Sequence, residues 1–130
     1  MVRDGLINAI GNYQGTVFVA SKEPVLFEVV ADAGIWDGRI EGIEKTESVS
    51  WSGRGDWVSG FFTAPMNSEW RIAHTGASNF MVRTFCLKGP EKWVVNEIGI
   101  YSETIDIELA GNPCVWIVNA DGDWSINLQK

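Results

Sequence analysis

From Thr16 onward, this chain repeats short apolar runs in which apolar and polar residues alternate, and glycine interrupts them about every ten residues. No segment has the 3.6-residue period of an amphipathic helix. Two-residue alternation is typical of strands, so the chain is predicted to be all-β. Turn signals such as Asp37-Gly38 and Thr75-Gly76 divide it into about ten short strands.

The predicted strands are of two kinds. In residues 104–109, Ile105 and Ile107 point to one side while Asp106 and Glu108 point to the other, so one face of this strand should be wet. Three other runs are apolar on both faces and are predicted to lie in the interior, between layers: residues 25–31, 80–87 and 114–118.

The length of 130 residues suits one domain. About ten strands without helices predict an antiparallel β-sandwich of jelly-roll or Greek-key type, with a closed barrel as the rival. Residues 1–12 are expected to be an arm or an edge segment, and residues 13–130 a single sandwich domain.

Charge and hydropathy exclude several partners. The chain has 17 acidic against 10 basic residues, a formal charge of −7, which repels the phosphate backbone of nucleic acids. Residues 1–15 lack the apolar run of a signal peptide, and no stretch is long enough to cross a membrane. Neither nucleic-acid binding nor membrane insertion is expected.

Cys86 and Cys114 each lie in an apolar, strand-like run. Buried free thiols are the default for cysteines in such runs. A disulfide is the alternative if the two strands adjoin in an oxidising compartment.

Little in the sequence points to catalysis. The single histidine, His74, ends a predicted strand, and its ring is expected to pack while a ring nitrogen meets a backbone partner. Neither a G-x-S-x-G nor an H-E-x-x-H motif is present, and the many carboxylates do not single out a catalytic pair. Arg54-Gly55-Asp56 matches an integrin-attachment tripeptide, but a polar loop is the favoured interpretation. No enzymatic activity is predicted.

Asn119, Asp121 and Asp123 alternate like the first three ligands of a calcium loop. Trp124 stands where such a loop needs glycine. A tight Asp-Gly hairpin turn, with Gly122 supplying a positive φ, is the preferred interpretation, and no cofactor is expected apart from this calcium alternative.

The seven tryptophans are many for this length. Four alternate in phase with apolar neighbours and are predicted to pack in the core: Trp36, Trp70, Trp116 and Trp124. The other three, Trp51, Trp57 and Trp93, are candidates for a binding surface, because aromatic rings stack on sugar rings.

Four stretches carry a family resemblance: GRGDWVS at 53–59, GASNFMV at 76–82, VVNEIG at 94–99 and VNADGDWSI at 118–126. With them the chain resembles a small β-sandwich domain that recurs in secreted, surface and phage-associated bacterial proteins, usually without an assigned activity. The resemblance implies a fold and a location at a cell surface or in a virion, and it brings no catalytic residues.

The expected function is that of a non-catalytic interaction or assembly domain, such as an accessory component of a surface layer, filament or virion. Its expected partners are other copies of itself or another structural protein. The alternative is a carbohydrate-binding module that uses exposed tryptophans, with a glycan as its partner.

Overall fold

The computed structural model describes residues 6–7, 12–20, 26–31, 34–89, 91–109 and 113–129. Eight strands lie in these residues. They are β1 (Ser50–Arg54), β2 (Trp57–Val58), β3 (Asn67–His74), β4 (Asn79–Cys86), β5 (Lys92–Ile98), β6 (Tyr101–Glu108), β7 (Cys114–Ala120) and β8 (Asp123–Leu128).

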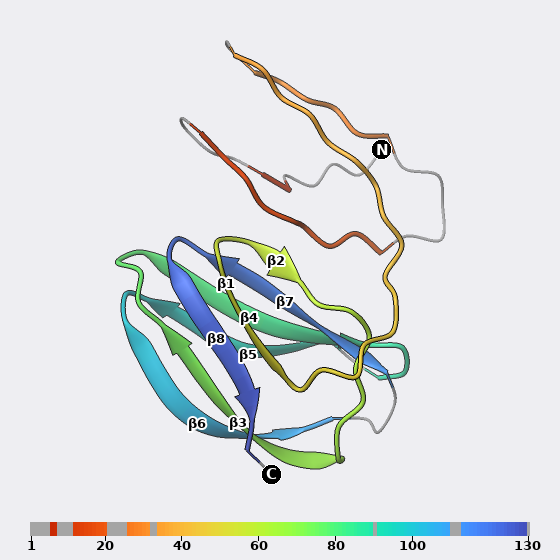
Figure 1. The fold of residues 1–130 in the computed structure, drawn as a ribbon, viewed down its shortest axis with the longest axis vertical. Helices are drawn as coiled ribbons and strands as arrows, with labels where there is room; N and C mark the ends of the chain where they lie inside the picture. The colour runs from red at the N-terminus through yellow and green to blue at the C-terminus, as the bar shows by residue number, and fades with distance from the viewer. Residues whose placement is uncertain are drawn as a thin grey trace.

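The eight strands form two antiparallel four-stranded sheets, with the orders β1-β8-β3-β6 and β2-β7-β4-β5. The sheets pack face to face, which confirms the predicted all-β sandwich (Figure 1). Only β4 and β5 are consecutive neighbours within one sheet, so every other connection crosses between the sheets. The loops at the two ends therefore join the layers.

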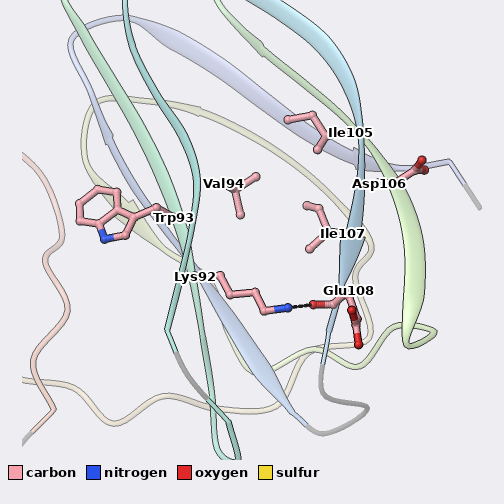
Figure 2. Close-up of a pocket in the computed structure, with 7 residues that line it drawn as sticks. All are labelled: Lys92, Trp93, Val94, Ile105, Asp106, Ile107 and Glu108. Carbon is pink, nitrogen blue, oxygen red and sulfur yellow. Dashed lines mark hydrogen bonds between the residues drawn. The ribbon is translucent and has the colours of Figure 1, made fainter.

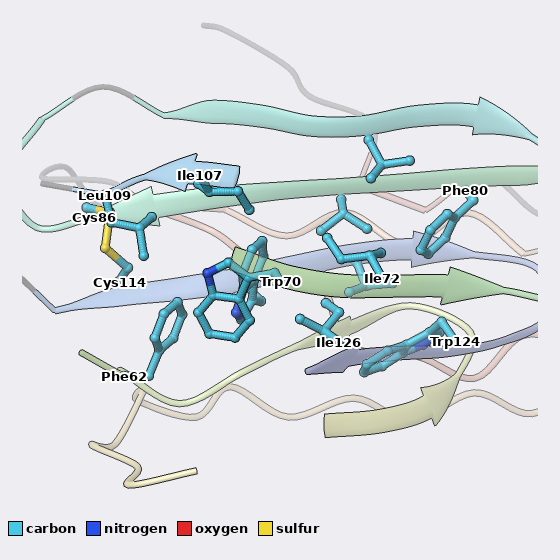
Figure 3. Packing of buried hydrophobic residues seen from close by; sticks show 14 residues of the cluster. Phe62, Trp70, Ile72, Phe80, Cys86, Ile107, Leu109, Cys114, Trp124 and Ile126 are labelled. Atoms are coloured by element: carbon cyan, nitrogen blue, oxygen red, sulfur yellow. A yellow bond between two sulfur atoms is a disulfide. The ribbon is translucent and has the colours of Figure 1, made fainter. Parts of the chain in front are cut away.

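Alternation builds the core between the sheets. In β3, Trp70 and Ile72 point inward and are fully buried, while Arg71 between them is exposed. The aromatic centre forms where these strands meet: the Phe62 and Trp116 rings stack at 5.7 Å, and Trp70 meets Trp116 edge to face at 5.1 Å (Figure 3). Each such side chain contributes roughly 1.5–3 kcal/mol when it leaves water.

The alternation predicted for residues 104–109 is confirmed. Ile107 is buried and Ile105 packs against the core, whereas Asp106 and Glu108 of the same strand are exposed. This strand, β6, is an edge of its sheet, and its wet, charged face discourages further strands from pairing there.

The strand β7 is buried on both faces, as predicted. Trp116 and Val118 face the core, and Val115 and Ile117 face outward yet are also buried. The amino-terminal segment covers this outer face.

Residues 13–18, here called the strap, form that cover. Thr16 N–H donates to Asp56 O beside β2 at 3.1 Å, and the Phe18 ring lies 5.0 Å from that of Phe85 in β4. Because β7 lies between β2 and β4, the strap must pass over β7. The strap therefore accounts for the burial of Val115 and Ile117 on the outer face of β7.

Two predictions for the first part of the chain are wrong. Residues 26–31 form no strand and are exposed, although they were expected in the sandwich interior; residue 25 lies outside the described residues. Trp36, expected in the core, is 62% exposed. An apolar sequence pattern indicates that a segment is more stable when it is buried. It does not specify which surface covers the segment.

Before β1, the described chain is extended and contains one isolated bridge, Lys45 with Phe61 (Figure 1). Period-two alternation therefore overestimated the strands there, and eight described strands stand against about ten expected. Whether residues 1–12 form a separate arm stays a prediction, because most of them lie outside the described residues.

Candidate functional site

The structure does not bring the three candidate tryptophans together. Trp51 and Trp57 are partly buried and pack against the core. The Trp51 ring is stacked on Trp70 at 6.2 Å, and the Trp57 ring lies 4.9 Å from that of Trp124. These two rings extend the inter-sheet aromatic cluster, because β1 and β2 place them at its margin.

Trp93 is different, since its ring is 60% exposed. It lies on β5, the opposite edge of its sheet from β2. The guanidinium of Arg83 sits 5.6 Å from the ring centre, and Arg83 is in turn 2.6 Å from the carboxylate of Glu91. The ring is thereby held on the outer face of the sheet.

A shallow cleft opens beside Trp93, between the edge strands β5 and β6 (Figure 2). Its volume is about 250 Å³. The lining residues are Lys92, Trp93, Val94, Ile105, Asp106, Ile107 and Glu108. Ligand pockets for drug-sized molecules start near ~300 Å³, so this cleft has room for one small ring.

Polar groups in the cleft bridge the two sheets. Lys92 Nζ donates to the backbone carbonyl of Glu108, and the side chains of Asp106 and Glu108 are exposed beside it. The Trp93 indole and the carboxylates of Asp106 and Glu108 lie on opposite sides of β5 (Figure 2), so the ring offers a stacking surface of its own at the rim of the cleft.

His74 lies at the other end of the sandwich, where β3 ends. Its ring is fully buried and stacks on Phe80 at 4.4 Å, and Nδ1–H donates to Gly99 O at 2.8 Å. The prediction of a packed ring with a backbone partner is confirmed. Nε2 additionally lies 3.1 Å from Asp121 Oδ1, without hydrogen-bond alignment.

At this corner, Asp121 contacts both His74 at the end of β3 and the loop that joins β3 to β4. Besides facing His74, it accepts a hydrogen bond from Ser78 N–H to Oδ2 at 3.0 Å. A Cβ on Gly76 would fall 2.2 Å from Asp121 Oδ1, and one on Gly122 would fall 2.6 Å from Gly76 Cα. The corner is thus closely packed, and neither Gly76 nor Gly122 leaves room for a side chain.

The interpretation of residues 121–122 as a hairpin turn is wrong. The strands on either side, β7 and β8, belong to different sheets, so this turn is a corner between layers. Gly122 is also not among the positive-φ glycines of the described chain. Close approach to Gly76, and not a left-handed backbone, requires glycine at this position.

The three calcium candidates have separate surroundings. Asp121 faces His74, Asp123 Oδ1 lies 3.4 Å from an Arg54 nitrogen, and Asn119 lies on β7 opposite Met81. Among the described residues, no group of three or more His, Cys, Asp or Glu side chains is placed to hold a metal ion.

Asp56, within the tripeptide of residues 54–56, uses both carboxylate oxygens internally. Tyr13 O–H donates to Oδ2 at 2.7 Å, and Ala120 N–H donates to Oδ1 at 3.1 Å. A carboxylate committed in this way ties the strap to the sandwich and is not presented to an external cation, which favours the structural interpretation of this loop.

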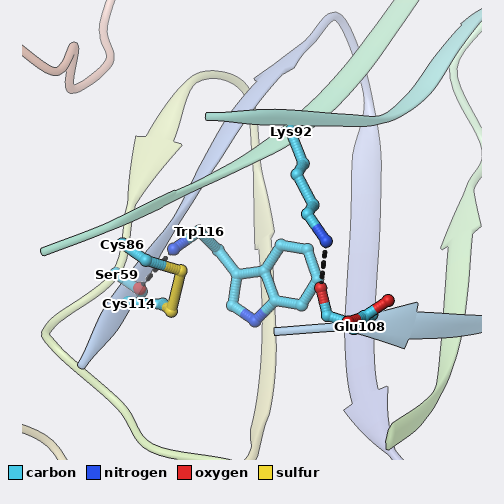
Figure 4. The surroundings of a disulfide bond; sticks show 6 residues. All are labelled: Ser59, Cys86, Lys92, Glu108, Cys114 and Trp116. Carbon is cyan, nitrogen blue, oxygen red and sulfur yellow. Dashed lines mark hydrogen bonds between the residues drawn. A yellow bond between two sulfur atoms is a disulfide. The ribbon is translucent and has the colours of Figure 1, made fainter. Parts of the chain in front are cut away.

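Cys86 and Cys114 form a disulfide, so the default of free thiols is wrong. The two residues are directly opposite each other in the β4–β7 pairing, with their Cα atoms 4.0 Å apart. The Trp116 side chain lies beside the sulfur atoms, and Trp116 N–H donates to Ser59 Oγ at 2.8 Å (Figure 4). The bond joins the two central strands of this sheet, and both cysteines belong to the buried core.

Sequence reasoning missed the strap and the His74–Asp121 contact. Tyr13, Gly15 and Phe18 carry no local signal of a partner, although the close packing of Gly15 against Tyr13 and Asp56 explains its glycine. His74 and Asp121 are far apart in the sequence, and only the crossing of the sheets brings them together.

No protein-family profile matches this sequence, and no curated protein matches it. No helix of the described residues is long and apolar enough to cross a membrane. Function therefore has to be inferred from the geometry described above.

Proposed function

We propose that this protein is a non-catalytic interaction or assembly domain, an accessory structural component of a surface layer, filament or virion. One observation carries the proposal: the chain separates its apolar residues into two groups. Among the described residues, all the buried hydrophobic ones belong to Phe62 and later positions, whereas most of the large exposed ones precede Ser50. A closed core joined to an exposed apolar segment is the organisation of a module that docks.

The energetic argument is direct. Burying an apolar side chain against a partner contributes roughly 1.5–3 kcal/mol, so covering the exposed segment would strongly favour association. The sandwich has its own core and does not need that energy to fold.

The surroundings of the histidine support a non-catalytic role. His74 is buried, stacked on Phe80 and engaged at Nδ1, so it does not reach the cleft between β5 and β6. We also infer a jelly-roll connectivity, supported by the strand orders and by the crossing connections. Such sandwiches occur in capsid and lectin domains, a likeness of fold alone.

The test is solution mass by light scattering over a concentration series, with electron microscopy of the heaviest fraction. A defined oligomer, ring or filament is expected. A single-chain mass at every concentration would contradict self-assembly.

The second candidate is a carbohydrate-binding module, favoured by the exposed Trp93 beside the cleft. If it is correct, a glycan array gives a reproducible ligand, and Trp93→Ala abolishes binding. Trp36→Ala is the matched control, since it also removes an exposed indole but does not line the cleft. An array without signal at millimolar sensitivity would remove this candidate.

A further inference from the structure

We infer that the extended segment of residues 26–31 and 34–43, here called the arm, assembles with the arm of a second copy of this chain. The inference rests on the proposed assembly function and names the surface that performs it. Three features of the described residues support it: exposure, two-sided apolarity and the lack of another apolar surface.

The arm is exposed along its described length except at Ile43, which is partly buried. Val30 is 85% exposed, Ile40 is 81% exposed and Ile35 is fully exposed. Among the described residues, the hydrogen bonds, bridges and ring contacts that join the first 49 residues to the sandwich come from the strap and from residues 44–49. The arm between them makes none, and it extends away from both sheets (Figure 1).

Both sides of the arm are apolar. Leu26 with Phe27, Val29 with Val30, and Ile35 with Trp36 are adjacent pairs of exposed large apolar residues. In extended chain, successive side chains point in opposite directions. A single flat partner would cover one member of each pair and leave the other in water, so the arm needs apolar neighbours on two sides.

The sandwich of another copy does not supply such neighbours. Its exposed large apolar residues among the described positions are few and are spread over separate strands and loops: Met66, Leu87, Trp93, Ile98 and Ile100. Three of its four sheet edges are also protected. Residues 44–46 bond to Phe61 next to β2, β5 carries a register shift opposite Val82 and Arg83, and β6 has an acidic outer face.

Among the described residues, the arm therefore holds the largest group of exposed large apolar side chains that the chain can offer to another arm. Symmetric association of identical segments covers equal surfaces equally, which is how homo-oligomers close. Arms from neighbouring copies on both sides would enclose both sides of each arm, and the sandwiches would project outward from the shared axis.

The test uses the full chain with Val30→Asp, Ile35→Asp and Ile40→Asp combined. The control carries the same three charges on the sandwich, as Met66→Asp, Leu87→Asp and Ile100→Asp, at sites that are also exposed. We expect light scattering to give a multi-copy mass for the wild type and the control, and a single-chain mass for the arm variant. Tryptophan fluorescence and thermal unfolding should show an intact sandwich in all three.

The outcomes separate the two proposals. A wild-type oligomer that survives the arm substitutions, or that only the sandwich substitutions dissociate, overturns the arm inference and leaves the assembly function standing. A wild type that is single-chain at all concentrations overturns both.

A second measurement does not depend on loss of assembly. Gly38→Cys places a thiol in the arm at a position with open space around it. A short bis-maleimide should link two copies of this variant, whereas Thr63→Cys, on an exposed part of the sandwich, should give single chains. Equal linking of both variants would contradict arm-to-arm contact.

Discussion

Gly76 and Gly122 meet at the corner where β3, β4, β7 and β8 connect, and neither leaves room for a side chain. A Cβ on Gly76 would lie 2.2 Å from Asp121 Oδ1 and 2.6 Å from His74 Nε2. The His74–Asp121 contact and the Ser78–Asp121 hydrogen bond therefore depend on two residues that contribute no side-chain atoms.

Gly76→Ala should lower the free energy of unfolding by about 1–3 kcal/mol, because the added methyl displaces the His74 ring or the Asp121 carboxylate. Gly38→Ala is the control, since a Cβ there meets nothing within 4 Å. Its effect should stay within about 0.5 kcal/mol in the same urea titration. Equal effects of the two substitutions would refute the tight corner.

Thr84 is fully buried on the core side of β4, and its hydroxyl has no hydrogen-bond partner among the described residues. Thr84→Val keeps the shape and removes the unpaired polar atom, so it should stabilise the protein by about 1 kcal/mol. Thermal unfolding measures this, with Thr63→Val as an exposed control. A lower melting temperature for Thr84→Val would show that the hydroxyl is in fact bonded.

Both tyrosines should ionise above their ordinary pKa of 10 in the folded protein. Burial raises the pKa of Tyr13 most, and its hydrogen bond to Asp56 adds to the rise. Burial also raises the pKa of Tyr101, helped by the charges of Glu103 and Glu97.

The consequence for stability has a definite sign. A raised folded pKa stabilises the protein below pH 10, and the contribution is lost as the pH rises through the folded value. Absorbance at alkaline pH should show phenolate forming later in folded protein than in urea. Tyr13→Phe should remove part of that delay; identical curves in both solvents would contradict it.

Among the elements, β4 and β7 carry the covalent link of the sandwich. The Cys86–Cys114 bond closes a loop of 28 residues at the centre of one sheet. Cross-linking a loop of that length restricts the unfolded chain and is worth about 3 kcal/mol.

The double variant Cys86→Ala/Cys114→Ala should therefore lose about 3 kcal/mol or more, since both side chains are buried and leave small cavities. Urea denaturation of the variant, and of wild type with a reductant, should shift in the same direction. If the reductant leaves the midpoint of the wild type unchanged under unfolding conditions, the bond contributes nothing to stability.

For the whole molecule, the arm and the sandwich should differ in protease resistance. Trypsin should cut first after Arg39, whose side chain is exposed and whose ion partner is the neighbouring Glu41. Arg54 and Arg71, which lie in strands, should be cut later. Mass spectrometry of a time course in dilute protein should find a long-lived fragment that begins at Ile40. A first cut inside the sandwich would contradict this.

Concentration adds a second readout to the same experiment. If arms cover one another, cleavage after Arg39 should slow as protein concentration rises at a fixed ratio of trypsin to protein. Cleavage that is independent of concentration would argue against mutual cover.

The sequence by itself determined the class of fold, because two-residue alternation and regular turn signals act locally and leave strands as the only consistent structure. It also identified the inward side of β6 and the core positions of Trp70, Trp116 and Trp124, since alternation assigns faces without knowledge of partners. His74 could be interpreted correctly for the same reason, as its phase on β3 already directed it inward.

Only the tertiary structure decided which strands adjoin and which apolar segments are enclosed. The Cys86–Cys114 bond, the His74–Asp121 contact and the strap over β7 all join residues distant in sequence, and alternation contains no information about such pairs. The sequence of the arm is as apolar as that of the core strands, so the sequence alone predicted burial for part of it. Burial also requires a second surface that covers the segment. Among the described residues of one chain, no surface covers the arm.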